Sequence, residues 1–341
     1  MTIRHRAAFV ATVALVCGAG LASTGCGKYS WSTLTAVKSF KDGNAEYARK
    51  DWKKAAEKYE EVVKHEDAMV KLPQLTTAYF FLGNSYDQLY RPGKKGDPQN
   101  DNYLTLAAKH YRTAIEKLAN STDPKEREIR RSSYEYLIAL YSADKLNDFS
   151  KAEPVAKELI AVDPNNPAPY QMLARLYEDQ GRFQEAEAFL LQAIDKSPTE
   201  ATGYQLLAGF YNKQGEFEKT MAAWTKRAEM EPNNPEAWHT IGVYYQDKVF
   251  KDKRLARDVA KDYSLKGIAA EDKALAINPE YADAMVYKNI LMRHQALYER
   301  DPKLQKQLGE DAEKLLQKAM AIQKKQNADA GAAGKGKGAG S

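Results

Sequence analysis

Residue types that could carry catalysis are few and scattered along the chain. The histidines are His5, His65, His110, His239 and His294, and no two of them lie three or four residues apart. A zinc site on one helix face needs two ligands at that spacing. The sequence therefore predicts no metal site, and it leaves mainly carboxylates for any acid–base chemistry.

Other reactive groups are equally limited. Cys17 and Cys26 both lie before residue 27, so the rest of the chain has no disulfide and no thiolate ligand. Residues 331–338 contain Gly-x4-Gly-Lys, but glycine replaces the Ser or Thr that would follow in a phosphate-binding loop. Carboxylates such as Glu185 fall between apolar positions, where exposed side chains are expected. The sequence predicts no cofactor and no catalytic residue.

The charge balance argues against a nucleic-acid partner. Of the 341 residues, 51 are Lys or Arg and 46 are Asp or Glu, which leaves a net charge of +5. Basic and acidic residues alternate, as in 50–54, so no stripe of one sign forms. An excess this small does not indicate binding to a polyanion, and we expect no nucleic acid.

The N-terminus is typical of an export signal. Arg4 and Arg6 precede residues 7–22, which carry no charge. This apolar run is shorter than the ~20 residues that span a bilayer, and the small residues 23–25 follow it, so a cleaved signal is predicted. A mitochondrial presequence is an alternative, although such segments are amphipathic and not continuously apolar.

The end of this segment is similar to a bacterial lipobox. Residues 21–26 read Leu-Ala-Ser-Thr-Gly-Cys, in which Thr-Gly-Cys fits the motif and Ser23 stands where Leu is preferred. The resemblance implies that Cys26 becomes the mature N-terminus and carries the lipid that anchors the chain. The protein would then be an outer-membrane or cell-envelope lipoprotein facing the periplasm. Ordinary cleavage, giving a soluble periplasmic protein, is the alternative.

Prolines mark an internal repeat in the middle of the chain. Pro164, Pro198 and Pro232 are each 34 residues apart. Residues 167–200 and 201–234 carry the same residue types at helical spacing, at unit positions 4, 7, 8, 11, 15 and 17. In chain order these are Tyr170, Leu173, Ala174, Tyr177, Gly181 and Phe183, then Tyr204, Leu207, Ala208, Tyr211, Gly215 and Phe217. This pattern resembles the tetratricopeptide repeat.

The resemblance extends less tightly over most of the chain, to about seven repeats. It implies an all-α fold, a right-handed superhelical solenoid of antiparallel helix pairs, in which each repeat has a helix A followed by a helix B. Residues 91–98 are expected to form a surface loop, and an insertion at 248–266 is expected to lengthen the helices. The predicted domains are the signal peptide 1–25, a linker 26–34, the solenoid 35–326 and a disordered tail 327–341.

In this family the A helices line the concave side of the solenoid, and unit positions 2, 5, 9 and 12 commonly contact the ligand. The residues that we select by this correspondence are Gln171, Arg175, Glu178, Gln205, Asn212, His239, Val243 and Gln246. They are mixed polar and nearly neutral, which suits an extended or helical polypeptide. Arg175 offers a planar donor fork, and His239 offers a group that titrates near neutral pH.

These features lead to one functional hypothesis and two alternatives. The first is a protein–protein interaction scaffold of the cell envelope that binds a polypeptide segment in the concave groove, with other proteins or peptides as partners and the membrane contacted through acylated Cys26. The second is a soluble periplasmic peptide-binding module. The third is an enzyme with its active site in the insertions. No nucleophile–base pair and no set of metal ligands supports this alternative, so we expect that the protein is not an enzyme.

Overall fold

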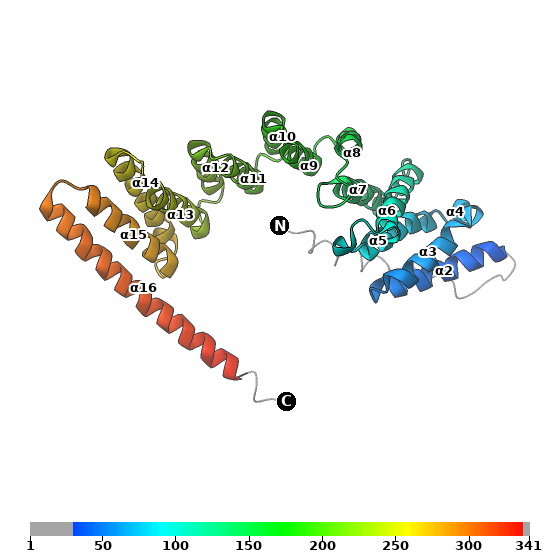
Figure 1. Ribbon diagram of the computed structural model, residues 1–341. Helices are drawn as coiled ribbons and strands as arrows, with labels where there is room; N and C mark the ends of the chain where they lie inside the picture. The colour runs from blue at the N-terminus through cyan, green and yellow to red at the C-terminus, as the bar shows by residue number, and fades with distance from the viewer. Residues whose placement is uncertain (1–29, 337–341) are drawn as a thin grey trace. The chain divides into compact units, whose positions relative to one another are not determined.

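The computed structural model describes residues 30–336, with the side chains of residues 30–328. This part of the chain consists of α-helices and short 3₁₀ turns, and it contains no strand (Figure 1). The predicted signal segment, Cys26 and residues 337–341 lie outside the described residues. No helix within 30–336 is long and apolar enough to cross a membrane.

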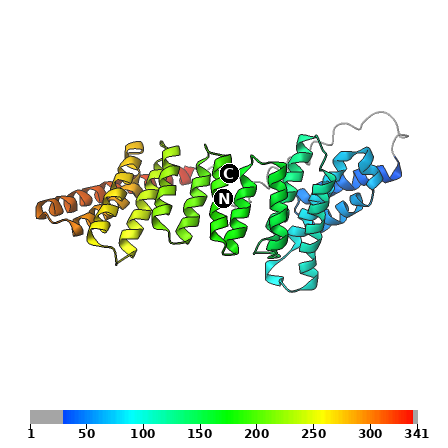
Figure 2. The same cartoon turned by 90° about the horizontal axis from the view of Figure 1, so that it is seen from above.

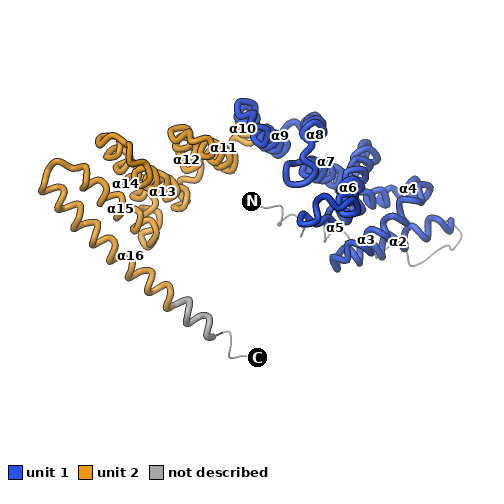
Figure 3. The backbone as a smooth tube through the Cα atoms, in the orientation of Figure 1, with its two compact units in different colours: residues 1–189 blue, residues 190–341 orange. Residues whose placement is uncertain are grey.

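The chain divides into two compact units, residues 1–189 and 190–341, and the boundary between them falls inside α10 (Figure 3). Within each unit, successive helices lie side by side as antiparallel pairs (Figure 2). This confirms the predicted all-α fold of helix pairs. The helices are α2 (Trp31–Ala48), α3 (Trp52–Val63), α4 (Glu66–Lys71), α5 (Ala78–Leu89), α6 (Pro98–Lys117), α7 (Pro124–Tyr141), α8 (Phe149–Val162), α9 (Pro167–Asp179), α10 (Phe183–Lys196), α11 (Ala201–Lys213), α12 (Phe217–Met230), α13 (Pro235–Lys251), α14 (Arg257–Ile277), α15 (Ala282–Tyr298) and α16 (Pro302–Gly336).

Helix starts follow from the Asn-Pro pairs of the repeat. Asn166 precedes Pro167 at the start of α9, and its side-chain oxygen accepts a hydrogen bond of 3.0 Å from the backbone N–H of Ala168. Asn234 caps α13 in the same way, 3.0 Å from the N–H of Glu236. Proline suits the first helical position, because the missing N–H would have no partner there.

The turns between helix A and helix B need a residue that tolerates positive φ. Gly181, between α9 and α10, has φ of 71°, and Gly215, between α11 and α12, has φ of 74°. A side chain is strained in this region, which explains glycine at unit position 15. Both turns confirm the predicted helix boundaries.

Helix B of residues 167–200, the fourth repeat, has alanine at unit positions 20 and 27, and α12 of the fifth repeat has Thr220 and Arg227 at these positions. Both replacements have local explanations. Thr220 takes the place of the small residue at position 20, is fully buried, and donates from its hydroxyl to the carbonyl of Glu216 at 2.9 Å. Arg227 takes the place of the small residue at unit position 27. It lies over the ring of Trp224, 5.3 Å from the centroid, and pairs with Glu231 at 3.4 Å. The polar groups of both replacements are therefore paired, whereas the buried indole N–H of Trp224 on the same helix has no hydrogen-bond partner among the described residues.

The insertions lie where the sequence predicts them. Residues 91–99 are exposed and contain a 3₁₀ turn, Pro92–Lys94, between α5 and α6. The sixth repeat consists of α13, with 17 residues, and α14, with 21 residues. The fifth repeat consists of α11 and α12, with 13 and 14 residues. The insertion thus lengthens both helices, as predicted.

The N-terminal end of the solenoid adds elements beyond helix pairs. The short helix α4 and a 3₁₀ turn, Pro73–Thr77, separate α3 from α5. Helix α4 packs against α2 and this turn, whereas α5 packs against α3, α6, α7 and the turn, so every residue of α5 from Ala78 to Asp87 is buried. A helix that is buried all round belongs to a core and offers no open face.

The two predicted ends of the solenoid differ from the helix ends. Helix α2 begins at Trp31, ahead of the predicted start at 35, because Ser30 caps it by accepting from the N–H of Thr33 at 3.3 Å. Helix α16 continues from the predicted boundary at 326 to Gly336.

Candidate partner-binding surface

In two repeats a side-chain hydrogen bond ties helix A to the turn before it. In α9 the hydroxyl of Tyr170 donates to the backbone carbonyl of Pro164 at 3.0 Å. In α13 the indole N–H of Trp238 donates to the carbonyl of Pro232 at 3.3 Å. Both rings occupy unit position 4, and both prolines end the preceding helix B. This bond fixes the approach of successive repeats and hence which face of helix A remains uncovered.

Close contact between helix A and helix B depends on small residues at unit position 8. A Cβ atom on Gly43 would lie 2.9 Å from the Tyr59 ring of the paired helix, and one on Gly83 would lie 3.0 Å from the Tyr111 ring. Both rings are fully buried. Glycine therefore makes room for a large side chain from helix B at the centre of the pair.

In the sixth repeat this space holds a carboxylate. A Cβ on Gly242 would lie 2.1 Å from Oε1 of Glu271, a fully buried side chain of α14. Nδ1 of His239, on α13, lies 3.0 Å from both oxygens of this carboxylate. The His239 ring packs edge-on against Tyr281 and Tyr287, with centroids 5.0 and 5.1 Å away.

Burial dominates the electrostatics of this pair. It raises the pKa of Glu271 from 4.5 to about 7, and the hydrogen bond and charge of His239 only partly oppose the shift. Close to neutral pH Glu271 therefore still holds a proton that an exposed glutamate would have lost. Since Glu271 has no exposed surface and the His239 side chain is 12% exposed, a bound segment has little access to either group.

Comparison with known families identifies the repeat. The family model of the tetratricopeptide repeat matches residues 145–210, which run from the turn before α8 into α11. This match covers 66 of the 341 residues, and it supports the similarity of the repeat pattern to the tetratricopeptide repeat. No match is found among the curated proteins.

Three solved structures illustrate the similarity. The chain is 17% identical to the C-terminal part of a repeat-containing protein from Cytophaga hutchinsonii, with a TM-score of 0.49, over 82% of this chain and 98% of that one. It is 17% identical to YrrB, described as "a TPR protein with an unusual peptide-binding site", with a TM-score of 0.39, over 63% and 93% of the two chains. It is also 17% identical to MamA from Desulfovibrio magneticus RS-1, with a TM-score of 0.34, over 64% and 96%.

The predicted groove residues of the tetratricopeptide repeats differ widely in exposure. Three are exposed, four are half-buried, and one is buried in the core. In that order they are Arg175, Gln205 and Asn212, then Gln171, Glu178, His239 and Val243, then Gln246. Gln246 lies on the same face of α13 as Gly242, four residues earlier, and this face packs against neighbouring helices.

The exposed face of α11 is the most open of these surfaces. Gln205, Gly209 and Asn212 follow one another at i, i+4 and i+7, so they share one face of the helix. A Cβ atom on Gly209 would meet nothing within 4 Å. Leu206, beside Gln205, is 41% exposed. We call Gln205, Leu206, Gly209 and Asn212 the α11 face.

Arg175 on α9 is also accessible, and its guanidinium pairs with a side chain from another element. Its guanidinium lies 3.7 Å from the carboxylate of Asp144, in the turn after α7, and the two side chains are 70% and 82% exposed. An ion pair this exposed contributes little to stability. The guanidinium can therefore exchange Asp144 for a carboxylate or carbonyl of a bound segment.

The first tetratricopeptide repeats offer no comparable groove. Asn84 of α5 accepts from the Tyr47 hydroxyl at 2.7 Å and donates to the Tyr111 hydroxyl at 3.2 Å. Asp87, one turn further on, pairs with Lys145. Both α5 side chains are buried, so ligand positions of the second repeat serve the core.

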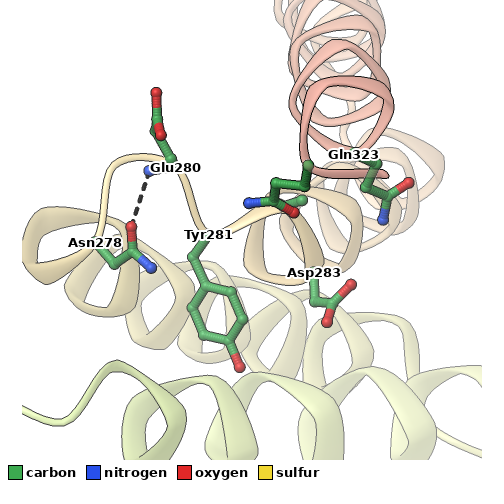
Figure 4. Close-up of a pocket in the computed structure, with 7 residues that line it drawn as sticks. Asn278, Glu280, Tyr281, Asp283 and Gln323 are labelled. Carbon is green, nitrogen blue, oxygen red and sulfur yellow. Dashed lines mark hydrogen bonds between the residues drawn. The ribbon is translucent and has the colours of Figure 1, made fainter. Parts of the chain in front are cut away.

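Small-molecule sites are not evident among the described residues. A recess of about 290 Å³ lies between α16 and the turn before α15, and Tyr281, Asp283 and Gln323 line it (Figure 4). It is open and mostly polar, and at its rim Asn278 accepts from the N–H of Glu280 at 3.1 Å. Sites for small organic ligands are mostly apolar and enclosed. Within residues 30–336, no group of three His, Cys, Asp or Glu side chains is placed to hold a metal.

Sequence reasoning missed Glu271 because of the insertion. Once the 13 extra residues of the sixth repeat are removed, Glu271 falls at unit position 24, counting Pro235 as position 1. Tyr59 holds that position in the first repeat, opposite Gly43. Glycine at position 8 facing an acid at position 24 is the signal that could have found the pair.

Proposed function

We propose that this protein is an exported interaction scaffold of the cell envelope, which binds a segment of another protein on the A helices of its tetratricopeptide repeats. Such repeats serve in general as modules for binding proteins or peptides. The observation that carries the proposal is the α11 face, where polar side chains and a glycine remain uncovered although the opposite side of the helix is packed.

The chemistry of the α11 face suits a polypeptide backbone. The amides of Gln205 and Asn212 each donate and accept, which matches the alternating N–H and C=O groups of an extended chain. Gly209 between them lets a backbone approach α11 closely. The exposed part of Leu206 adds an apolar contact. Because the face carries no charge, its specificity comes from hydrogen bonds and shape.

Affinity capture tests the binding proposal. The mature chain is used as bait on detergent-solubilised envelope, next to the variant Gln205→Ala/Asn212→Ala. The matched control is Gln192→Ala/Asn233→Ala, which removes the same side-chain types from exposed sites on α10 and in the turn before α13. We expect the control to retain the partner and the first variant to lose it. Equal capture by both would place the binding surface elsewhere.

Anchoring through Cys26 forms the second part of the proposal, and it is supported by the Thr-Gly-Cys sequence after the apolar run. A mass spectrum of the mature protein should show an acylated Cys26, and a wash at high salt should release Cys26→Ser from the membrane fraction but leave the acylated wild type there. An unmodified chain that is fully soluble would favour the alternative of a soluble periplasmic peptide-binding module.

A further inference from the structure

Large apolar side chains are exposed at the N-terminal end of the first unit. Trp31, at the start of α2, is 83% exposed, and Leu34, one turn later, is 51% exposed. Val70, on α4, is 83% exposed. Tryptophan rarely lies in water to this extent without a surface to contact, since its ring carries a large apolar area.

The two helices that carry these three side chains lie together. Helices α2 and α4 contact each other (Figure 1). The hydroxyl of Ser32 donates to the carboxylate of Asp67. Trp31 is next to Ser32 in the chain, and Val70 lies one helical turn from Asp67. We call Trp31, Leu34 and Val70 the N-terminal patch.

Basic residues extend the patch along α2. Trp31, Leu34, Lys38 and Lys41 lie at i, i+3, i+7 and i+10, so they follow one face of the helix, and all four are exposed. Lys71, next to Val70, is exposed as well.

Acidic side chains beside the patch are engaged by other groups. Glu66 pairs with Lys117 at 3.3 Å, and Asp67 accepts the Ser32 hydroxyl. An apolar end followed by lysines on one helix face is the arrangement of helices that lie at the surface of an anionic membrane.

The short segment between Cys26 and Trp31 also favours a membrane surface as the partner of the N-terminal patch. Trp31 follows Cys26 by five residues, and five residues span at most about 18 Å when fully extended. A lipid on Cys26 would therefore hold the start of α2 within that distance of the headgroups. Tryptophan favours this interfacial zone, and lysine side chains interact with anionic headgroups.

We propose that the N-terminal patch rests on the surface of an anionic phospholipid bilayer and orients the first unit against the membrane. The proposal builds on the proposed anchoring through Cys26 and adds a second attachment. Stable membrane binding commonly needs two signals, of which an acyl group is one and an apolar or basic surface the other.

The test uses the mature chain from residue 26 with Cys26→Ser, so that no lipid contributes to binding. Its partitioning is measured by co-sedimentation with vesicles of phosphatidylglycerol and phosphatidylethanolamine, and with vesicles of phosphatidylcholine. We expect binding to the anionic vesicles only, with a blue shift in tryptophan fluorescence that disappears in Trp31→Phe.

Serine at all three positions of the patch should lower the partition coefficient by about tenfold or more, because most of its apolar area is lost. The matched control is Phe250→Ser/Leu297→Ser, which removes two side chains that are 54% and 66% exposed in the second unit. It should bind like the parent chain. Circular dichroism of each variant verifies that the helices are intact.

Three outcomes would overturn the proposal. The first is that the parent chain does not bind anionic vesicles, and the second is that the patch variant binds them as well as the parent chain does. The third is self-association of the parent chain that the patch variant abolishes, which would assign the patch to contact with a second copy of this protein. None of them affects acylation of Cys26 or partner capture by the α11 face. Conversely, a soluble, unmodified Cys26 would refute the anchor while leaving vesicle binding measurable.

Discussion

Nδ1 of His239 lies 3.0 Å from both carboxylate oxygens of Glu271, and the pair fills the space that Gly242 leaves between α13 and α14. The contact takes His239 out of the set of groove residues and makes it part of a helix interface. The titration of Glu271 is therefore expected to change protein stability before it changes partner binding.

The first prediction concerns stability against pH. Glu271 has a pKa of about 7 in the folded protein, because it is buried, and 4.5 as an ordinary glutamate. The contribution of Glu271 to the free energy of unfolding is fully present below pH 4.5. It is lost as the pH rises from 4.5 towards 7, because in this range the folded state binds a proton that the unfolded state has released. We expect the melting temperature of the wild type to fall relative to that of Glu271→Gln across this range, by an amount equivalent to roughly 1–3 kcal/mol.

The comparison with Glu271→Gln is needed because another buried group acts in the opposite direction. Burial lowers the pKa of His110 from 6.5 to about 4, so its contribution decreases as pH falls through this range. His110 is present in both proteins and cancels in the difference. A difference in melting temperature that stays constant from pH 4.5 to 8 would show that Glu271 is not protonated in the folded state.

The second prediction concerns the space at Gly242. In Gly242→Ala the new methyl group would lie 2.1 Å from Oε1 of Glu271, so the carboxylate must move away from His239. We expect a loss of roughly 1–3 kcal/mol in the free energy of unfolding, although alanine favours a helix by about 1 kcal/mol. Urea unfolding measures it. Gly209→Ala is the control, since nothing lies within 4 Å of its methyl group, and it should be neutral or stabilising.

The repeat itself was predictable because its determinants are local. Proline spacing gave the helix ends, and Gly181 and Gly215 marked turns whose positive φ the structure confirms. Each of these residues acts within a few positions of the chain, so a single sequence reveals it. The lengthened helices α13 and α14 were predicted for the same reason, from a long stretch with few helix breakers.

Contacts between distant segments were not predictable in this way. Glu271 is 32 residues from His239, and the insertion obscured its place in the repeat. Asn84 and Asp87 occupy family ligand positions but are buried, because α3, α6, α7 and the turn 73–77 enclose α5. Position within a repeat predicts which side of the helix a residue occupies, whereas exposure also depends on what packs against it.

The third prediction tests the packing inside the fourth repeat. Ala186, at unit position 20 on α10, is fully buried. We expect Ala186→Leu to lower the free energy of unfolding by roughly 1–3 kcal/mol, since the larger side chain must displace its neighbours. Ala222→Leu on α12 introduces the same group at an exposed site and should change stability by less than about 0.5 kcal/mol. Equal thermal melting curves for the two variants would contradict the assignment of position 20.

The fourth prediction separates binding from stability at Arg175. Its pair with Asp144 is highly exposed, so Arg175→Ala should change the free energy of unfolding by less than about 0.5 kcal/mol. Affinity for a captured partner should fall by about tenfold, equivalent to roughly 1.4 kcal/mol, because the planar guanidinium supplies charge-assisted hydrogen bonds that a methyl group cannot replace. Lysine at this position should restore only part of the affinity, since it keeps the charge but loses the two-pronged geometry. Arg49→Ala is the matched control: its side chain is 72% exposed and likewise belongs to a surface ion pair, with Glu46 at 3.1 Å. Isothermal titration of the four proteins with one partner decides the matter, and an equal loss of affinity in Arg49→Ala would indicate a general effect of surface charge instead of a contact at Arg175.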